Sequence, residues 1–247
     1  MRDQIVWLTD KKVMKRWTMT QVWENVLFAH WSLPMEVVRK HIPAELEVDT
    51  FNGEAWVGVI LFKMNGFKLR FTPFRYPFSF PEINLRTYVK VNERPAIFFM
   101  TLDAADPLVV SVAKRWYRLP YFHAKMSFSK QEDMISFHSE RKSVGDSVVI
   151  GGEFYPVSEQ FVPKDGSIDH WLTERYVYFN KDPNNHIYWG EVYHEPWQLR
   201  KVSGKFSDNT LLHPYQIELP GEPHLLHYSR GVEAQMGAPG RYKTARR

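Results

Sequence analysis

Two segments of the sequence place ionisable side chains on one face of a predicted strand. In residues 82–91 the alternate positions are Glu82, Asn84, Arg86, Tyr88 and Lys90, and apolar residues or Thr87 stand between them. In residues 121–128 the same alternation separates Tyr121, His123, Lys125 and Ser127 from Phe122, Ala124, Met126 and Phe128. Because successive side chains of a strand point to opposite faces, each segment has one apolar face and one face that could do acid–base chemistry.

These ionisable faces have two interpretations. On a sheet that is open to water, their charges form cross-strand pairs that contribute less than about 1 kcal/mol each. On a sheet that closes on itself, the same faces line a cavity, and Glu82, Arg86, Tyr121, His123 and Lys125 converge on a ligand. Partial burial would then shift their pKa values, as acid–base chemistry or carboxylate binding requires. The periodicity does not say which face points inward.

Other motifs for catalysis or cofactor binding are weak. His194 stands beside Glu195, but adjacent strand residues face opposite ways, which favours a surface turn, and we retain His194 only as a candidate ligand-binding residue. His224 and His227 lie in a segment without helical character. The sequence has no HExxH motif, no phosphate-binding loop and no GxSxG motif. We therefore predict no bound metal and no cofactor.

The composition predicts a β-rich globular protein. Of the 247 residues, 44% are hydrophobic, 24% are charged and 15% are aromatic, and aromatic residues suit pleated surfaces. With no linker or repeat, we expect one domain over residues 1–247, with a core at about residues 20–230 and basic tails. The absence of cysteine excludes disulfides, thiolate nucleophiles and cysteine-ligated zinc.

The ends of the chain bear on location and partners. The N-terminal residues are too charged for a signal peptide, and no apolar run has the roughly 20 residues of a membrane helix, so we expect a cytoplasmic protein without a membrane partner. The net charge of +4 comes largely from residues 11–16 and 241–247. Such basic ends are typically solvated tails, which we favour over nucleic-acid binding. The sequence leaves open whether the chain forms a homo-oligomer.

The spacing of apolar residues predicts many short elements. Helices are expected at 34–41, from Asp106-Pro107 with Leu108, Val112 and Trp116 as an apolar stripe, at 167–174, and at 9–21. Strands are expected at 55–64, 82–91, 96–102, 121–128, 134–141, 147–154, 175–180, 186–194 and 198–206. Because helices do not alternate with strands, the fold class is α+β, mostly antiparallel, with a curled or closed sheet and helices outside.

Several motifs together resemble a known family. They are FAHWSLPMEVVRKHIPAELEVDTFNGEAWVGVILF (28–62), FPEINLRTYV (80–89), FFMTLDA (98–104), RLPYFHAKM (118–126), LTERYVYF (172–179) and HEPWQL (194–199). The combination resembles the YqjF-like family of uncharacterised bacterial proteins, which is grouped with the acetoacetate decarboxylase-like superfamily. The resemblance implies a curled antiparallel β-cone with peripheral helices and a deep internal pocket.

The resemblance also bears on the chemistry. Acetoacetate decarboxylase forms a Schiff base through a lysine. Matching residues 114–120 to its motif places Tyr121 and Phe122 where two lysines would stand, and neither can form an imine. Glu82 falls near a pocket carboxylate of that enzyme. Lys125 lies four residues after Tyr121, roughly 13 Å further along a strand, and Lys114 fits only a shifted alignment.

We therefore expect a protein that binds a small carbonyl- or carboxylate-bearing metabolite in an internal pocket. Glu82 and Lys125 are the candidate catalytic residues, with Glu82 as the acid or base. The candidate substrate-binding residues are Arg86, Tyr121, His123, Arg115 and His194. The sequence leaves two alternatives open. The protein has an activity of lyase or hydrolase type on a keto or carboxylic acid, or it is a module that binds a ligand or a protein without catalysis.

Overall fold

Strands that are far apart in the sequence close into a cone in the computed structural model, which describes residues 17–142 and 147–242. The cone consists of β1 (Trp17–Leu33), β3 (Ala55–Leu69), β4 (Tyr76–Val91), β5 (Arg94–Ala104), β10 (Val177–Lys181), β11 (Ile187–Tyr193) and β13 (Leu225–Gly237). Their order is β11-β10-β5-β4-β3-β1-β13. The ring closes because β13 also pairs with β11, at Val192 with Met236 and at Tyr193 with Gln235. The pairing is antiparallel except between β10 and β5.

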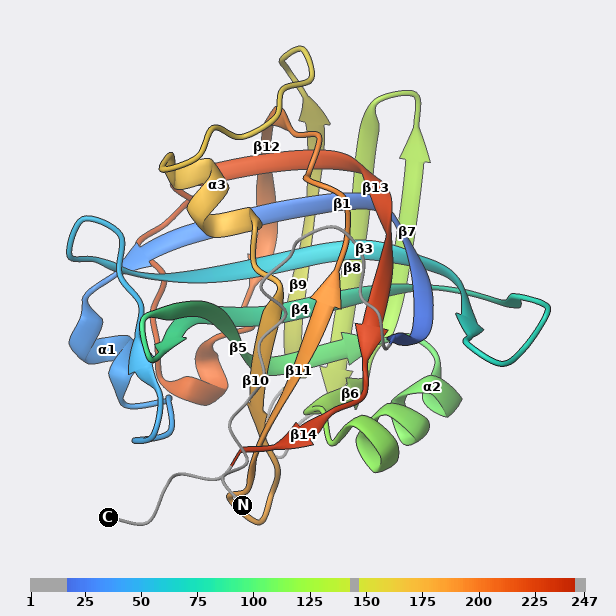
Figure 1. Ribbon diagram of the computed structural model, residues 1–247. Coiled ribbons are helices and arrows are strands. Elements are labelled where there is room, and N and C mark those ends of the chain that lie inside the picture. Colours follow the sequence, from blue (N-terminus) through green and yellow to red (C-terminus); the bar gives the residue numbers. More distant parts are fainter. Residues whose placement is uncertain (1–16, 143–146, 243–247) are drawn as a thin grey trace.

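A second antiparallel sheet continues from the cone. Strand β12 (Arg200–Asn209) pairs with β13 at its first two residues and then with β9 (Ser147–Pro156). Beyond β9 follow β8 (Met134–Lys142) and β7 (Lys125–Gln131). Figure 1 shows β7, β8 and β9 crossing the long strands of the cone at a steep angle. The short strands β2 (Glu47–Val48), β6 (Tyr121–His123) and β14 (Gly240–Arg241) extend the cone beside β4, β5 and β11.

The alternation along β4 separates two cores. Ile83 and Leu85 belong to a core on the outside of the cone, where the second sheet contributes Phe137 and Phe154. Tyr88 belongs to a core inside the cone, together with residues such as Phe28, Tyr178 and Trp197. The ionisable face of β4 therefore points into the cone. Closure of the sheet buries the inner face of β4, and packing of the second sheet buries its outer face.

The predicted helices are short and lie outside the cone. They are α1 (Met35–Arg39), α2 (Pro107–Val112) and α3 (Ile168–Thr173), with a π-turn at Ala113–Tyr117 and a 3-10 turn at His213–Tyr215. Asp106 Oδ1 accepts hydrogen bonds from the backbone N–H groups of Leu108 and Val109, and Ser167 caps α3 through the N–H of His170. The helices predicted at 34–41, from Asp106 and at 167–174 are thus confirmed. The helix predicted at 9–21 is contradicted at residues 17–21, which form the start of β1. Its residues 9–16 lie outside the described residues.

Strands β1 and β13 were not predicted, because both break their alternation at the same place. Asn25 adopts φ of 52° in β1, where the register shifts between Glu24 and Leu27. Gly231 of β13 lies opposite Glu24 with φ of 131°, and a Cβ there would be 1.9 Å from the carbonyl oxygen of Trp23. Only glycine fits this close approach of the two backbones. The bulge interrupts the period of two on which sequence-based strand prediction depends.

The prediction of a single strand at 121–128 is wrong. The chain forms β6, which runs parallel to β5, and after Ala124 it leaves the cone as β7 of the second sheet. The N–H of Ala124 donates to the carbonyl oxygen of Ala104, at the end of β5. Since β6 and β7 belong to different sheets, the alternation of 121–128 does not place its polar residues on one common face.

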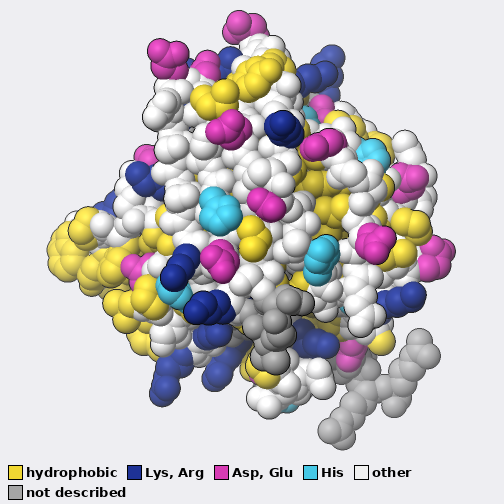
Figure 2. Space-filling view, turned by 180° about the vertical axis from the view of Figure 1, so that it is seen from behind, with side chains coloured by type: hydrophobic (Ala, Val, Ile, Leu, Met, Phe, Trp, Pro, Cys, Tyr) yellow, Lys and Arg dark blue, Asp and Glu magenta, His cyan; other side chains and the backbone are white. Residues whose placement is uncertain are grey.

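The hairpin between β3 and β4 extends beyond the cone and exposes large apolar side chains. Phe71 is 94% exposed and Phe74 is 55% exposed. Figure 2 shows hydrophobic side chains gathered at the edge of the molecule that this hairpin forms. Within the described residues, no helix is both long and apolar enough to span a membrane.

Candidate ligand-binding site

A cavity of about 390 Å³ opens into the cone between the β3–β4 hairpin and α2. Its lining comes from β1, β3, β4, β5, β6, β10, β11 and β13, together with α2 and the π-turn that follows it. Most of the lining side chains are apolar or aromatic. The polar exceptions include Gln21, Glu82, Asn84, Tyr121 and Tyr178. A largely apolar cavity with a few polar groups is typical of small-molecule sites.

Glu82 is the buried carboxyl group of this cavity. Its side chain leaves β4 on the inner face, and the residue is only 2% exposed. The hydroxyl of Tyr121 donates to Oε1 of Glu82 across 2.8 Å. Oε2 is buried as well and finds no partner among the described residues. One carboxyl oxygen is therefore satisfied, and the other is left to interact with a molecule in the cavity.

Burial raises the pKa of Glu82 to about 8. The hydrogen bond from Tyr121 lowers this pKa and the nearby Asp103 raises it, but both effects are smaller than that of burial. Burial also raises the pKa of Tyr121 well above its ordinary value, and the carboxyl of Glu82 adds to the increase. At neutral pH the pair is therefore a neutral carboxylic acid beside a neutral phenol, and Glu82 can both donate and accept a proton near that pH.

Two further polar groups of the cavity lack a partner among the described residues. They are Oδ1 of Asn84, two residues along β4 from Glu82, and the hydroxyl of Tyr178 on β10. Buried polar atoms without partners are costly and rare in folded proteins. Asn84 was placed on the ionisable face of β4 from the sequence but was not selected as a site residue. Tyr178 was missed, although it alternates with Val177 and Phe179 in a predicted strand.

A buried ion pair lies behind Glu82 on the other face of the sheet. Arg141 of β8 donates from Nη1 to Oδ1 of Asp103 on β5 across 2.9 Å, and both side chains are at most 5% exposed. Burial raises the pKa of Asp103 to about 6, against the opposing effect of Arg141. The guanidinium also lies 4.4 Å from the ring centroid of Phe122. This pair joins the second sheet to the cone, and its Asp103 carboxyl contributes to the raised pKa of Glu82.

Arg86 points into the cone but does not line the cavity. Its Nη2 donates to the carbonyl oxygen of Leu172, at the end of α3, across 2.8 Å. The hydroxyl of Tyr88 donates to the same carbonyl and lies 2.8 Å from Nε2 of His30. Arg86 thus holds α3 against the cone, and the structure does not bring it to Glu82 as part of one site.

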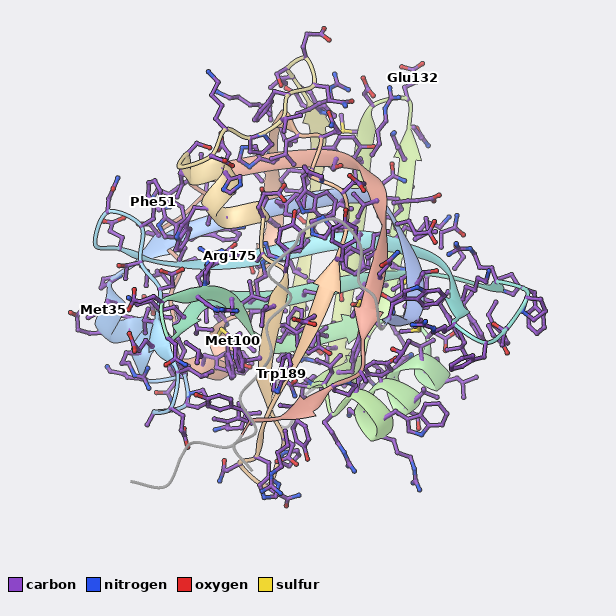
Figure 3. The ribbon with its side chains drawn as sticks, in the orientation of Figure 1. Met35, Phe51, Met100, Glu132, Arg175 and Trp189 are labelled. Carbon is purple, nitrogen blue, oxygen red and sulfur yellow. The ribbon has the colours of Figure 1, made fainter. Side chains whose placement is uncertain are left out.

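Arg175 extends this polar cluster under α3 (Figure 3). Its Nη1 lies 2.7 Å from Oδ2 of Asp49, and its guanidinium covers the rings of Tyr88 and Trp171. Burial lowers the pKa of His30, which keeps that imidazole neutral. The cluster satisfies the carbonyl groups of Trp171 and Leu172 in α3, which is a structural task. Three of its own buried nitrogens have no partner among the described residues: Nδ1 of His30, Nε of Arg86 and Nη2 of Arg175.

The structure brings neither Lys125, His123 nor Arg115 to the cavity. Lys125 is exposed at the start of β7, because the chain changes sheets just before it. His123 is exposed where β5 and β6 both end. Arg115 is exposed on the π-turn after α2, as is Lys114, whose Nζ lies 5.1 Å from the ring centroid of Phe122.

His194 is buried, so the surface turn favoured for it is wrong. Its ring packs 4.7 Å from Trp197 and 4.9 Å from Tyr176, centroid to centroid, and Nδ1 lies 2.8 Å from the carbonyl oxygen of Glu195. Burial lowers its pKa. His194 borders a small hollow near α3 instead of the main cavity.

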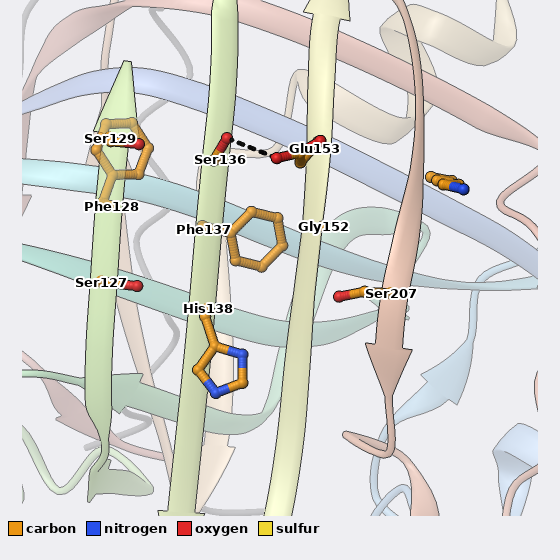
Figure 4. Close-up of a pocket in the computed structure, with 10 residues that line it drawn as sticks. Ser127, Phe128, Ser129, Ser136, Phe137, His138, Gly152, Glu153 and Ser207 are labelled. Atoms are coloured by element: carbon orange, nitrogen blue, oxygen red, sulfur yellow. Dashed lines mark hydrogen bonds between the residues drawn. The ribbon is translucent and has the colours of Figure 1, made fainter. Parts of the chain in front are cut away.

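Another hollow lies on the exposed face of the second sheet (Figure 4). Its polar residues are mainly serines, with His138, Glu153 and Lys205. Ser136 donates to Glu153 across 3.4 Å, the bond drawn in Figure 4. His138, Glu153 and Lys205 are all exposed, which makes this hollow a weaker site than the cavity of Glu82. Within residues 17–142 and 147–242, no group of three or more His, Asp or Glu side chains is placed to hold a metal ion.

Sequence comparison assigns the family. The model of the DUF2071 family, described as an uncharacterized conserved protein, matches residues 20–233. The chain belongs to the DUF2071 family. This DUF2071 protein is also 37% identical over 215 residues to the uncharacterized protein YqjF of Bacillus subtilis (strain 168), covering 87% of this chain and 88% of YqjF. The resemblance to the YqjF-like family is confirmed.

Solved structures share the fold of this DUF2071 protein. The enduracididine biosynthesis enzyme MppR complexed with pyruvate superposes with a TM-score of 0.63 at 11% identity, over 94% of this chain and 93% of that one. Acetoacetate decarboxylase from Legionella pneumophila superposes with a TM-score of 0.62 at 9% identity, over 96% of this chain and 93% of that chain. An acetoacetate decarboxylase-like enzyme from Sphingomonas wittichii gives 0.58 at 11% identity, over 98% of both chains. The acetoacetate decarboxylase-like fold is thereby confirmed.

Proposed function

We propose that this DUF2071 protein binds a small molecule with an apolar body and a carbonyl group, and that Glu82 donates a hydrogen bond to the carbonyl oxygen. The proposal rests on one observation: a buried carboxyl group with a raised pKa has an unpartnered oxygen in a largely apolar cavity. We place the proton on Oε2, because Oε1 already accepts from Tyr121. The neutral acid is then a donor inside a site of low polarity, where such a bond is strong.

The charge of the lining favours a neutral carbonyl over a carboxylate. No Lys, Arg or His is among the described residues that line the cavity. A carboxylate would lose its hydration there without gaining a cation, which is costly. MppR, a protein of the same fold, binds pyruvate, which carries a carbonyl group next to a carboxylate. The ligand proposed here shares the carbonyl group with pyruvate but has an apolar body in place of the carboxylate.

Glu82 is placed for acid–base chemistry on such a ligand. In the fraction of molecules in which Glu82 is ionised, its carboxylate can take a proton from the carbon next to the carbonyl, which leaves an enolate and a neutral Glu82. After exchange with water, the same carboxyl group returns a proton to that carbon, and a group with a pKa near the ambient pH is suited to both steps. Imine chemistry has no support, since no lysine is among the described residues that line the cavity. Tyr121 orients Glu82 through its hydroxyl. The alternative is a module that binds the same ligand without changing it.

Thermal shift measurements test binding. The purified chain is heated with straight-chain 2-alkanones of increasing length and with alkanoates of the same lengths. We expect the ketones to raise Tm in a concentration-dependent way and the carboxylates to have little effect at neutral pH. Glu82→Leu removes the donor and should abolish the shift, whereas Glu82→Gln retains an N–H donor and should keep part of it. Glu153→Gln, on the exposed face of the second sheet, is the matched control.

Exchange of protons separates catalysis from binding. In heavy water, NMR follows the replacement of the hydrogens next to the ketone carbonyl by deuterium. Catalysis by Glu82 predicts exchange with the wild-type chain and its loss in Glu82→Gln. Binding without exchange would favour the non-catalytic module. Equal Tm shifts in wild type and Glu82→Leu would refute the proposed site.

A further inference from the structure

The mouth of the cavity is built from apolar side chains that face water. Leu108 is 60% exposed, Val112 is 41% exposed and Trp116 is 66% exposed, yet all three line the cavity. The sequence predicted them as one stripe of a helix, and such a stripe normally packs on the protein core. Here the α2 segment instead presents the stripe at the opening. Large exposed apolar groups that cluster in this way mark an interaction surface.

The β3–β4 hairpin supplies the other side of this mouth. From Phe74 inward, aromatic rings follow one another: Phe74 to Tyr76 at 5.1 Å, Tyr76 to Phe67 at 4.9 Å, and Phe67 to Phe78 at 5.6 Å between centroids. Tyr76, Phe67 and Phe78 line the cavity. The hairpin tip is thereby connected to the cavity of Glu82 by an apolar path. We name Phe71, Phe74, Leu108, Val112 and Trp116 the apolar rim.

The two segments that carry the apolar rim contain basic residues and no acidic ones. Residues 67–78 of the hairpin contain Lys68, Arg70 and Arg75, and residues 107–119 contain Lys114, Arg115 and Arg118, with no Asp or Glu in either segment. Arg75 is paired with Glu233 across 2.9 Å. Lys114, Arg115 and Arg118 have exposed side chains beside Trp116. Exposed aromatic groups surrounded by Lys and Arg are the combination that binds anionic membrane surfaces.

We propose that the apolar rim docks on an anionic lipid surface and that the cavity receives its ligand from that surface. Phe71 and Phe74 enter the acyl boundary, Trp116 lies at headgroup level, and the surrounding basic side chains contact the phosphates. The mouth of the cavity then opens onto the apolar layer, so that a lipophilic carbonyl compound can enter without crossing water. This inference differs from the expectation of no membrane partner, which considered only spanning segments and the basic ends.

A second copy of the chain is a less suitable occupant of the apolar rim. In a two-fold dimer the same patch meets itself, which would bring the basic residues of the two rims together. Like charges facing each other across an interface oppose association. An anionic lipid surface, by contrast, supplies the negative charge that the rim lacks.

Vesicle sedimentation tests this docking with the full chain. Wild-type protein is mixed with phosphatidylcholine vesicles, with or without phosphatidylglycerol, and the bound fraction is measured. We expect binding to the anionic vesicles that weakens with salt. Phe71→Ser combined with Phe74→Ser should lower the partition coefficient by about tenfold or more. Lys114→Gln combined with Arg115→Gln should lower it by about thirtyfold on anionic vesicles alone. Tyr155→Ser combined with Val157→Ser removes exposed apolar groups elsewhere and should bind as wild type.

Several outcomes would overturn the docking. They are a lack of wild-type binding, unchanged binding of the Phe71 and Phe74 variant, and a dimer in light scattering that this variant dissociates. Entry of the ligand from the lipid surface rests on the proposed function, whereas docking rests on the apolar rim alone, so the two proposals fail separately. Loss of vesicle binding with intact ketone binding in solution is expected for the rim variant, and the reverse is expected for Glu82→Leu.

Discussion

Tyr121 donates its hydroxyl hydrogen to Oε1 of Glu82 across 2.8 Å, although the two residues are 39 positions apart in the sequence. Strand β6 carries Tyr121 beside Leu102 of β5, and Leu102 in turn lies beside Asn84 of β4. The phenol therefore reaches Glu82 diagonally across β5 on the inner face of the cone. This contact fixes one oxygen of a buried acid and leaves the other without a protein partner.

Glu82 should make the stability of the protein fall as pH rises. Its folded pKa of about 8 lies above its ordinary value of 4.5, so between these values the folded state holds a proton that the unfolded state has lost. The free energy of unfolding then decreases with pH by up to about 1.4 kcal/mol per unit. Glu82→Gln should flatten this dependence and raise stability near pH 8. Urea unfolding of wild type and variant over this range measures the difference, with Glu153→Gln as the control. Parallel curves would contradict the prediction.

Tyr121→Phe should raise the pKa of Glu82 further. The hydrogen bond from Tyr121 lowers that pKa, so its removal leaves burial without this opposing effect. We expect the variant to lose about 1–3 kcal/mol of stability, because a buried carboxyl loses its donor. Carbon-13 NMR of labelled glutamate side chains follows the titration. Tyr178→Phe, whose hydroxyl has no partner among the described residues, should change stability less. A Glu82 carboxyl that titrates at lower pH in Tyr121→Phe would count against the geometry.

Arg86→Met should affect folding more than ligand binding. The variant loses the bond to the carbonyl oxygen of Leu172, and we expect a cost of about 1.5–3 kcal/mol. Ketone affinity, measured by calorimetry at a temperature where the variant is folded, should stay within about twofold of wild type, since Arg86 does not line the cavity. The opposite result, a stable variant that no longer binds, would restore Arg86 as the substrate-binding residue expected from the sequence.

Asp103 and Arg141 should be strongly coupled. Arg141→Met leaves a buried carboxyl without its cation and should cost about 3–5 kcal/mol. Adding Asp103→Asn should recover a large part of that loss, because no uncompensated charge remains. Urea unfolding of wild type, both single variants and the double variant gives the coupling free energy. Additive effects would mean that the pair does not interact in solution.

The sequence by itself determined much of the secondary structure around the site. The alternation of 82–91 predicted a strand with one apolar and one ionisable face, and β4 has both, because each side of that strand meets a different core. The Asp106-Pro107 pair predicted the start of α2, since a cap and a proline act locally. Glu82 and Tyr121 were selected for their types and positions, and both line the cavity.

Only the tertiary structure decided which side chains meet. Closure of the cone depends on β13 pairing with both β1 and β11, and these contacts between distant segments leave no periodic signal in the sequence. The chain passes from the cone to the second sheet at Ala124, and this change separates Lys125 from Tyr121. The alternation of 121–128 had predicted both residues on the same face of one strand. Burial raised the pKa of Glu82, and burial is a property of everything packed around a residue. The sequence specifies which ionisable groups are present, whereas closure of the sheet determines which of them are buried away from water.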